Sequence, residues 1–357
     1  MTSVEAVIVA GGLGTRLRPL TVNAPKHLLP VAGVPFVVHQ VAKLAAAGVR
    51  RVVLATSYHA EQFQPILGDG QPWGVELVYV REAKPLGTAG AIRNVADHLD
   101  SASDDPVVIV NGDILSGHDL PAQIDRHRAE RADVTLHLVE VPDARAYGCV
   151  PTRAGWVTAF LEKSPDPISH QINAGCYVFA RSIVDAIPAG RVVSVERETF
   201  PALLEGGRRV LGHVDRSYWI DVGTPAALVQ ASSDLVRGVA ASPAYQQRPA
   251  ESFVDQASVH PTAAVRGGSA IGVDAVVGEG AVVDNSVVAP GAEVREWAVV
   301  VDSVLGPGSR VGARCVVRDS VVGDAADVGE RCELLAGARI GVGAVLAAGA
   351  VRFSPDD

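Results

Sequence analysis

Apolar runs of strand length alternate with amphipathic helical patterns from residue 4 to residue 131. The strand-like runs are VEAVIVA (4–10), RRVVLATS (50–57), VELVYV (75–80) and PVVIVNGD (106–113). The helical patterns cover 37–48, where Gly48 ends the helix, and stretches near 59–67, 88–99 and 118–131. This βαβ order predicts an α/β, Rossmann-like domain whose mixed, mostly parallel sheet is covered by helices. Ligands are expected at the carboxyl ends of its strands.

Strands of a more polar, alternating kind follow between residues 134 and 214, as in TLHLVEV (135–141) and WVTAFLEK (156–163). They predict an antiparallel extension that covers the same sheet. One more helix, beginning near Pro225, is expected to end the domain by about Gly238. We therefore assign residues 1–238 to this domain and 239–256, rich in Ala, Ser, Pro and Gln, to a linker.

The pattern then changes to a repeat that fills residues 257–357. Aliphatic residues recur every six positions, sometimes five, from Val259 to Val351, with a small residue two positions before each. Such pairs, directed inward, are what a triangular parallel β-helix requires. The segment resembles the hexapeptide repeat of left-handed β-helices. The pattern also explains Cys315 and Cys332 as packing residues.

Net charge and cysteine content narrow the functional classes. The formal charge of -9 includes no basic block, which disfavours nucleic-acid and membrane partners and requires phosphate binding to be local. The four cysteines show no CxxC spacing, which indicates reduced thiols rather than a disulfide scaffold. The first strand leaves no room for a leader, and no apolar run reaches membrane-spanning length. A cytoplasmic location is the expectation.

The strongest chemical signal is the loop AGGLGTRLRPLT (10–21), directly after the first strand. Glycines let backbone N–H groups approach phosphates, and Arg16 can place a fixed positive fork on the departing β and γ phosphates. A dinucleotide fingerprint does not fit, because its third glycine would fall at Leu17. A triphosphate P-loop does not fit either, because no GK[ST] follows.

GGxGTRLxPLT followed by Pro25-Lys26 resembles the opening signature of the sugar-phosphate nucleotidyltransferases. Further motifs occur in that family's order and spacing up to about residue 238. The resemblance implies a Mg²⁺-dependent enzyme that joins a nucleoside triphosphate to a sugar 1-phosphate and releases pyrophosphate. The catalytic residues that it implies are Arg16, Lys26, Asp113, Lys163 and Asp221.

The segment EAKPLGTAG (82–90) looks like the family's nucleobase loop. Gly87 and Gly90 would let the backbone line the base, and Glu82 could accept hydrogen bonds from N1–H and the amine of guanine. Glu82 could instead merely cap or solvate the loop. The nucleotide-binding residues are then Ala10, Gly11, Gly12, Gly14, Thr15, Arg16, Glu82, Pro85, Gly87, Thr88 and Gly90.

Two aspartates lie at strand ends, Asp113 in NGD (111–113) and Asp221 in WIDVGTP (219–225). Mg²⁺ prefers a few carboxylates together with phosphate oxygens, and by resemblance these two are the metal ligands. The alternative is that each aspartate caps a turn, which is the commoner role of Asp beside Gly.

The sugar-phosphate residues also follow from the resemblance. FLEK (160–163) is similar to the family's EKP segment, so that Lys163 would hold the phosphate and Glu162 the sugar hydroxyls, although Ser164 replaces the usual proline. His27 departs from the family's PKPLLP and is interpreted as a structural loop residue. The full set is Asn111, Gly112, Tyr147, Gly148, Glu162, Lys163, Asn173 and Gly175.

Within the family, PLGTAG, INAGCYVF, SVERETFP and YWIDVGTP are most similar to the mannose 1-phosphate guanylyltransferases that carry a β-helix tail. The resemblance implies GTP and mannose 1-phosphate as substrates. Another triphosphate, or another hexose, heptose or cyclitol 1-phosphate, stays open because a few contacts decide hydroxyl stereochemistry.

Two other functions fit the sequence less well. Acyl transfer by the β-helix usually needs a histidine base within the coils, and His260 is the only histidine of the tail. A non-catalytic nucleotide-sugar sensor would have lost metal or phosphate ligands, and none is missing. The tail is therefore expected to serve in packing and in homo-oligomer assembly.

Overall fold

The computed structural model describes residues 4–145, 147–161 and 166–353, and the chain forms two compact units. One unit combines residues 1–12 with 40–219, and the other combines 13–39 with 220–357. The glycine loop is thus divided after Gly12, which the sequence pattern did not indicate. The boundaries at 238 and 256 stay predictions.

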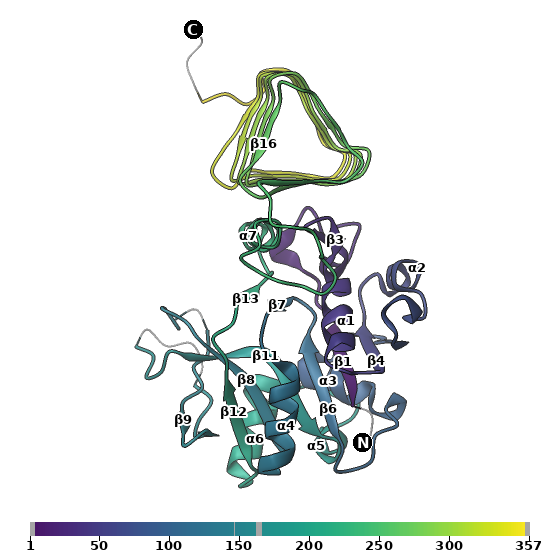
Figure 1. The fold of residues 1–357 in the computed structure, drawn as a ribbon, viewed down its shortest axis with the longest axis vertical. Helices are drawn as coiled ribbons and strands as arrows, with labels where there is room; N and C mark the ends of the chain where they lie inside the picture. Colours follow the sequence, from purple (N-terminus) through teal and green to yellow (C-terminus); the bar gives the residue numbers. More distant parts are fainter. Residues whose placement is uncertain (1–3, 146, 162–165, 354–357) are drawn as a thin grey trace. The chain divides into compact units, whose positions relative to one another are not determined.

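A mixed sheet forms the centre of the first unit (Figure 1), as predicted. β1, β4, β5 and β6 pair in parallel, and β11 then runs antiparallel to both β6 and β8. The expected antiparallel extension contains one parallel pair, β12 with β8. Among the described residues the order across the sheet is β5 (Glu76–Arg81), β4 (Arg51–Thr56), β1 (Glu5–Ala10), β6 (Pro106–Asn111), β11 (Gln171–Ala180), β8 (Val134–Glu140), β12 (Val210–Val214), β10 (Trp156–Val157) and β9 (Thr152–Arg153).

Helices bury both faces of this sheet, which is why its parallel strands are almost continuously apolar. Alternate residues of the strands pack with Ile92, Val184 and Phe200 in one core, so α3, α5 and α6 share that face. α4 contacts β6, β8 and β11 through the other face. The helices, with the π-helical turn η6, are α1 (Phe36–Ala46), α2 (Phe63–Leu67), α3 (Gly87–Asn94), α4 (Leu120–Glu130), α5 (Arg181–Ala186), η6 (Val195–Thr199) and α6 (Phe200–Glu205).

One predicted strand is much shorter than expected. The apolar alternation of 156–163 predicted a full strand, but β10 ends at Val157. Leu161 makes only an isolated antiparallel bridge with Cys149, and Glu162 and Lys163 lie outside the described residues. Thr158 instead turns back, because its backbone N–H donates to the carbonyl of Pro151 at 3.0 Å.

The second unit begins with the loop and small hairpin of residues 13–39. β2 (Pro30–Val31) pairs with β3 (Val34–Pro35), and β2 packs against α7 (Pro225–Val236), which Thr224 caps. The backbone N–H of Ala32 donates to Ser232 Oγ at 3.0 Å. These contacts attach the hairpin to the helix that leads toward the C-terminal coil.

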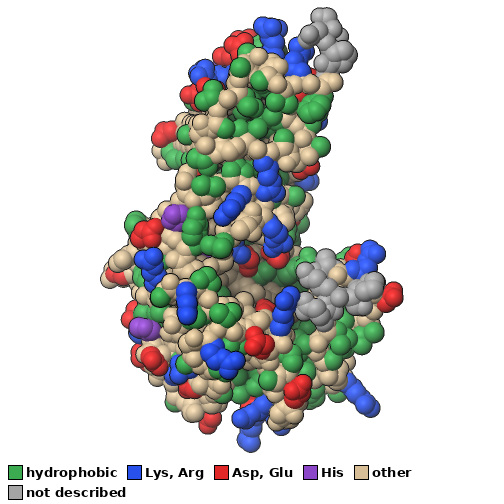
Figure 2. Space-filling view, turned by 180° about the vertical axis from the view of Figure 1, so that it is seen from behind, with side chains coloured by type: hydrophobic (Ala, Val, Ile, Leu, Met, Phe, Trp, Pro, Cys, Tyr) green, Lys and Arg blue, Asp and Glu red, His purple; other side chains and the backbone are tan. Residues whose placement is uncertain are grey.

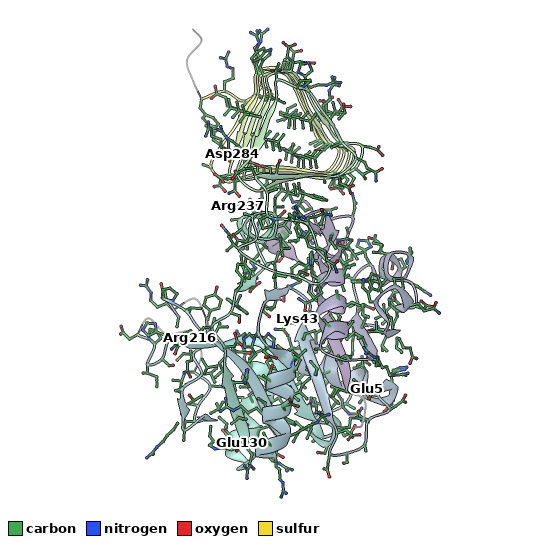
Figure 3. All side chains as sticks on the ribbon, viewed as in Figure 1. Glu5, Lys43, Glu130, Arg216, Arg237 and Asp284 are labelled. Carbon is green, nitrogen blue, oxygen red and sulfur yellow. The ribbon has the colours of Figure 1, made fainter. Side chains whose placement is uncertain are left out.

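Residues 252–346 form the predicted parallel β-helix, whose three sheets enclose a triangular interior (Figures 1 and 3). We call these sheets the β14 face, the β15 face and the β16 face. The β14 face contains β14 (Ser252–Val254), β17 (Ser269–Ile271), β20 (Val287–Val288), β23 (Val304–Leu305), β26 (Val321–Val322) and β29 (Arg339–Ile340). The β15 face contains β15 (Ser258–Val259), β18 (Val276–Val277), β21 (Glu293–Val294), β24 (Arg310–Val311), β27 (Asp327–Val328) and β30 (Val345–Leu346). The β16 face contains β16 (Ala264–Arg266), β19 (Val282–Asp284), β22 (Val299–Val301), β25 (Val316–Arg318) and β28 (Glu333–Leu334).

Small and aliphatic side chains fill the interior of the coil as the repeat predicted, and Cys315 and Cys332 are buried among them as free thiols. A column of serines adds polar support. The backbone N–H of Ser286 donates to Ser269 Oγ, and that of Ser303 to Ser286 Oγ, each at 3.1 Å. The first strand of the β-helix, β14, starts at Ser252.

Charged side chains are scattered over the surface. On the side that Figure 2 shows, Lys and Arg are interspersed with Asp and Glu, which agrees with the absence of a basic block in the sequence. Within residues 4–145, 147–161 and 166–353, every helix is too short or too polar to cross a lipid bilayer.

We expect Leu305→Ala to destabilise the coil by about 2–5 kcal/mol, because Leu305 is fully buried and truncation leaves a cavity. Urea unfolding followed by circular dichroism measures the change. Val345→Ala is the matched control, since Val345 belongs to the same β-helix and its side chain is 76 % exposed. Equal midpoints for the two variants would contradict the inward packing of Leu305.

Candidate active site

Three parallel strands end side by side where the glycine loop begins. Ala10 lies opposite Thr56, and Thr56 lies opposite Arg81, so the next residue of each strand reaches the same edge. Ser57 Oγ donates to the carbonyl of Gly11 at 2.6 Å. A Cβ on Gly11 would lie 3.2 Å from Ser57 Oγ, which is tight, and 3.4 Å from Glu82 Oε2, which is an ordinary contact distance. The predicted phosphate loop and the predicted base residue are thus neighbours in the first unit.

Glu82 is a buried carboxylate with an open hydrogen-bonding capacity. Its residue is 6 % exposed, and its backbone N–H donates to the carbonyl of Thr56 at 2.8 Å. Burial raises the pKa of the Glu82 carboxyl, while a hydrogen bond from the backbone of Leu86 opposes that shift. Oε1 accepts no hydrogen bond from any described residue. A ligand with paired N–H donors would satisfy it.

The loop after Glu82 is held by packing. A Cβ on Gly87 would lie 2.6 Å from the carbonyl of Val193, and one on Gly90 would lie 2.7 Å from that of Arg191. Thr88 Oγ1 donates to Glu196 Oε2 at 3.1 Å and accepts from the backbone N–H of Val195 at 2.8 Å. Close packing against 191–196 therefore accounts for both glycines, besides the role in lining the base that the sequence suggested.

The NGD segment follows β6. Val9 lies opposite Asn111, and the backbone N–H of Gly112 donates to the carbonyl of Val9 at 2.9 Å. Asp113 is half-buried in the turn between β6 and β7 (Ile114–Ser116). The register thus carries Asn111 to the same edge of the sheet as Gly11.

The predicted sugar segment lies on a β-bulge of β11, between Asn173 and Tyr177. Asn173 Nδ2 donates to the hydroxyl of the fully buried Tyr177 at 2.8 Å, and Asn173 Oδ1 accepts from the backbone N–H of Gly175 at 3.1 Å. Gly175 has a φ of 76°, and a Cβ there would lie 2.9 Å from Asn111 Nδ2. The bulge thus brings two predicted sugar-binding amides together.

Aromatic residues flank this bulge. Trp219 Nε1 donates to the carbonyl of Ala174 at 3.0 Å, and the ring of Tyr147 meets the edge of Trp219 at 5.8 Å between centroids. Gly148 follows Tyr147 and is half-buried. Glu162, Lys163 and Ser164, the remaining predicted sugar-phosphate segment, lie outside the described residues.

The second unit holds the rest of the glycine loop. Gly14 has a φ of 59°, and its carbonyl accepts from Thr21 Oγ1 at 2.8 Å. A Cβ on Gly14 would lie 3.0 Å from the Cβ of Lys26, so Lys26 packs on the turn that precedes Thr15. His27 is 1 % exposed, in keeping with the structural role expected for it.

Arg16 and Asp221 both lie close to Gly223 in this second unit. A Cβ on Gly223 would collide with the Arg16 guanidinium and would lie 2.8 Å from Asp221 Oδ1. Asp221 ends β13 (Trp219–Asp221) and is half-buried. One predicted phosphate ligand and one predicted metal ligand are therefore neighbours, although they are far apart in the sequence.

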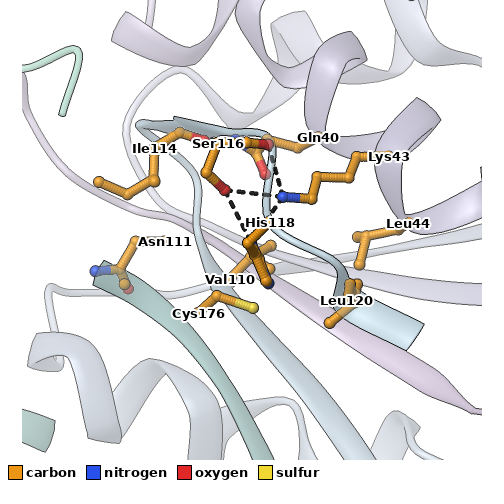
Figure 4. A pocket seen from close by; sticks show the side chains of 11 residues that line it. Gln40, Lys43, Leu44, Val110, Asn111, Ile114, Ser116, His118, Leu120 and Cys176 are labelled. Carbon is orange, nitrogen blue, oxygen red and sulfur yellow. Dashed lines mark hydrogen bonds between the residues drawn. The ribbon is translucent and has the colours of Figure 1, made fainter. Parts of the chain in front are cut away.

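A pocket that the sequence did not indicate is lined by Lys43, Ser116 and His118 together with apolar residues and Asn111 (Figure 4). Lys43 Nζ donates to the Ser116 carbonyl at 2.7 Å, to Ser116 Oγ at 2.8 Å and to His118 Nδ1 at 2.8 Å. His118 Nε2 then donates to Gln123 Oε1 at 3.1 Å. The three protons of the ammonium group are used, and they fix the tautomer of His118.

Burial lowers the pKa of each of these basic groups, which keeps His118 and His137 neutral but leaves Lys43 mostly protonated at neutral pH. It lowers the pKa of Lys43 to about 8, and it lowers the pKa of His118 far below the ordinary histidine value, with the Lys43 charge adding to the shift. His137 stacks on His118 at 3.8 Å between ring centroids, and burial lowers its pKa to about 3. Neither ring nitrogen of His137 has a hydrogen-bond partner among the described residues.

No cluster of three or more His, Cys, Asp or Glu side chains able to hold a metal occurs in the described part of the chain. Mg²⁺ commonly takes one or two carboxylates and completes its shell with phosphate oxygens and water. Asp113 and Asp221 offer hard carboxylate oxygens at half-buried strand ends, which is the right donor chemistry for such an ion.

Comparison with known proteins covers both parts of the chain. The family model described as Nucleotidyl transferase matches residues 5–238, and the model described as GMPPB C-terminal domain matches residues 250–349. A protein of Mycobacterium tuberculosis named mannose-1-phosphate guanylyltransferase is 54 % identical over 99 % of this chain and 98 % of its own length.

Solved structures resemble the N-terminal part. A putative glucose-1-phosphate thymidylyltransferase from Bacillus anthracis superposes with a TM-score of 0.59 and 25 % identity, over 65 % of this chain and 94 % of that one. HddC from Yersinia pseudotuberculosis, complexed with GMP-PN, superposes with a TM-score of 0.55 and 28 % identity, over 64 % and 98 %.

The buried histidines predict that the protein loses stability on mild acidification. Burial lowers the pKa of His39 and of His127 to about 4, and that of His137 to about 3. The unfolded chain takes up protons below pH 6.5, the ordinary value, whereas the folded chain does so only near pH 4 or lower. The free energy of unfolding should therefore fall from pH 6.5 toward pH 4, by about 2 kcal/mol at pH 5 for His137 alone.

Urea unfolding at pH 7.5 and pH 5 measures this effect. His137→Phe should reduce the difference between the two pH values, and His98→Gln, at an exposed site, should leave it as in the wild type. A His137→Phe variant with an undiminished pH dependence would exclude His137 as a source.

Proposed function

The chain belongs to the nucleotidyl transferase family, and from this premise we propose that it joins GTP and mannose 1-phosphate into GDP-mannose and pyrophosphate. This proposal rests on the 54 % sequence identity, across 99 % of the chain, to a protein named mannose-1-phosphate guanylyltransferase. The match includes the C-terminal coil as well as the glycine loop, so it concerns the whole architecture rather than one motif.

The reaction is a single in-line displacement. An oxygen of the sugar phosphate attacks the α-phosphorus of GTP, the bond from that phosphorus to the bridging oxygen breaks, and pyrophosphate leaves with the electron pair. Because the nucleophile is already an anion, no general base is required. The obstacle is the repulsion between two polyanions, so positioning and charge neutralisation carry the catalysis.

Three cations are proposed to neutralise this charge. Arg16, beside Gly223, would bind the β and γ phosphates with its planar guanidinium group. Lys26, packed on Gly14, would bind the triphosphate, and Lys163 would bind the phosphate of the sugar. The N–H groups around Gly11, Gly12 and Gly14 would add partial positive charge from the backbone.

Enzymes of this family generally use a divalent metal ion, and we assign Mg²⁺ to this one, held by Asp113 and Asp221. Their hard oxygen donors and half-buried positions support the assignment. When bound, Mg²⁺ neutralises charge on the triphosphate oxygens.

Recognition of the base is assigned to Glu82. Guanine presents N1–H and an amino group on one edge, and a carboxylate can accept from both. The open Oε1 and the burial of Glu82 support this role, because a buried acceptor without a donor is costly. Pro85, Gly87, Thr88 and Gly90 would shape the remainder of the base site.

Recognition of mannose 1-phosphate is assigned to the bulge of β11 and its neighbours. Amides and backbone groups suit sugar hydroxyls, because each offers both donor and acceptor positions. The residues are Asn111, Gly112, Tyr147, Gly148, Glu162, Asn173 and Gly175. A cytoplasmic location and homo-oligomers formed through the coil stay predictions from the sequence.

A substrate matrix tests the proposal. Purified enzyme is offered five nucleoside triphosphates against mannose, glucose, heptose and cyclitol phosphates, and pyrophosphate release is measured. The highest kcat/KM is expected for GTP with mannose 1-phosphate. A clear preference for another triphosphate or another sugar phosphate would replace the assigned substrates, and no pyrophosphate with any pair would remove the enzyme assignment.

Asp113→Asn and Arg16→Ala should each lower kcat by about 100-fold or more, because each removes charge complementarity to the triphosphate. Steady-state kinetics measures the loss, and circular dichroism checks that the fold is intact. The matched controls are Asp104→Asn and Arg248→Ala, both at exposed sites. Rates close to wild type in both Asp113→Asn and Arg16→Ala would refute these roles.

Glu82→Gln should reduce the preference for GTP over ATP by about tenfold, because the amide replaces one acceptor with a donor that faces a guanine donor. The ratio of the two kcat/KM values measures it. Glu61→Gln, at an exposed site, should keep the wild-type ratio. Glu82 has no role in base selection if its variant keeps that ratio too.

A further inference from the structure

The outward side chains of the β14 face are more deeply buried than those of the β15 face. On the β14 face, the outward side chains of Val287, Val304 and Val321 are each only 3 % exposed. On the β15 face, the corresponding positions carry polar or exposed side chains, such as Arg310 and Val276. An apolar, covered stripe on a single face indicates that the β14 face packs against other parts of its unit.

The hairpin and α7 make contacts with the first coils of that face. α7 packs against β17, and Ser233 Oγ donates to the carbonyl of Gly267 at 3.1 Å. A Cβ on Gly33 would lie 3.3 Å from Cδ1 of Phe253, which belongs to β14. The segment 13–39 is thus attached to the coil at its N-terminal end.

The last coils of the same face reach the glycine loop itself. Arg339, in β29, donates from Nη1 to the carbonyl of Arg16 at 2.7 Å and to that of Arg18 at 2.6 Å. One nitrogen with two hydrogens thus bridges two carbonyls that enclose Leu17. Because a guanidinium is always charged, both bonds are charge-assisted.

The neighbouring coil makes a second contact with the loop. Asn23 Nδ2 donates to Asp324 Oδ2 at 3.3 Å. Asp324 is separated from β26 by Gly323, and Val321 of β26 lies opposite Arg339. Partial burial raises the pKa of the Asp324 carboxyl, and the hydrogen bond from Asn23 opposes the shift. Two successive coils therefore hold residues 16–23 from one face.

The contacts within the loop itself are short-range, such as the bond from Thr21 Oγ1 to the Gly14 carbonyl at 2.8 Å. Thr15–Leu17 is a single 3₁₀ turn, closed by the bond from the Leu17 N–H to the Gly14 carbonyl at 2.9 Å. The side chain of Arg16 departs from the residue whose carbonyl Arg339 holds. A displacement of that peptide plane would redirect the Arg16 guanidinium, and a shift of about 1 Å at a positioned group can be costly in rate.

We propose that Arg339 is a positioning residue for nucleotidyl transfer, which clamps the carbonyls of Arg16 and Arg18 so that the glycine loop is ordered before the nucleotide binds. The inference rests on the proposed function for its kinetic readout. The C-terminal coil is then a working part of the nucleotide site, and not solely a module for assembly. Arg339 acts through Arg16 and does not itself touch the substrate.

The test compares Arg339→Ala and Arg339→Lys with Arg318→Ala in the full-length enzyme. Arg318 is an exposed arginine in β25, on the β16 face, and serves as the matched control. Arg339→Ala should lower kcat/KM for GTP by about fivefold to tenfold, and Arg339→Lys by less, because lysine keeps the charge without the fork. Arg318→Ala should match the wild type.

Two further readouts separate positioning from general stability. Hydrogen exchange of peptides covering residues 13–24 should speed up in Arg339→Ala and stay unchanged in Arg318→Ala. In an Arg16→Ala background, adding Arg339→Ala should cost little more, because the two residues act in series. The thermal unfolding midpoints of Arg339→Ala and Arg318→Ala are expected to agree.

Unchanged hydrogen exchange of residues 13–24 in Arg339→Ala would overturn the proposal that Arg339 orders the loop. Faster exchange combined with a wild-type kcat/KM would also overturn it. So would losses of kcat/KM that are fully additive when Arg339→Ala is combined with Arg16→Ala. Failure of the proposed function looks different. The wild type would then release no pyrophosphate from GTP and mannose 1-phosphate, while the exchange comparison would still decide whether Arg339 orders the loop.

Discussion

The register of β1 between β4 and β6 is the constraint on which the first unit depends. Ala10 lies opposite Thr56, and Val9 lies opposite Asn111, so three segments leave the sheet at one edge. The sheet's hydrogen bonding continues for one more residue here, since the backbone N–H of Glu82 donates to Thr56 and that of Gly112 donates to Val9. A slip of one residue would turn every strand side chain to the other face. The positions of Gly11 and Glu82 follow from this register.

The sequence was sufficient for features that depend on local pattern. The strand-helix alternation, the end of α1 at Ala46, two residues before Gly48, and the six-residue repeat are all set by neighbours in the chain. The burial of Cys315 followed from its slot in the repeat. Glu82 directly follows β5 and Asn111 ends β6, and both were site candidates because their segments resemble motifs of the family.

Features that depend on contacts between distant segments could not be predicted. The pocket of Lys43, Ser116 and His118 joins a helix to a short strand, and the two segments share no sequence motif. The shortness of β10 was hidden because alternation does not reveal which partner strand is present. Nor does any spacing in the sequence connect Arg339 with Arg16, because their contact spans more than three hundred residues.

Polar side chains in the first unit hold the predicted base segment and the predicted sugar segment in place. Thr88, at the start of α3, bonds Glu196, and the charge of Glu196 helps to raise the pKa of the buried Tyr177 hydroxyl, after the larger effect of burial. Tyr177 in turn accepts from Asn173 at the bulge. Because a buried hydroxyl that lost this partner would be costly, the amide is kept in one orientation. Thr88 and Asn173 are thus each held by a polar partner in the first unit, which favours base and sugar segments that are already ordered when the substrates arrive.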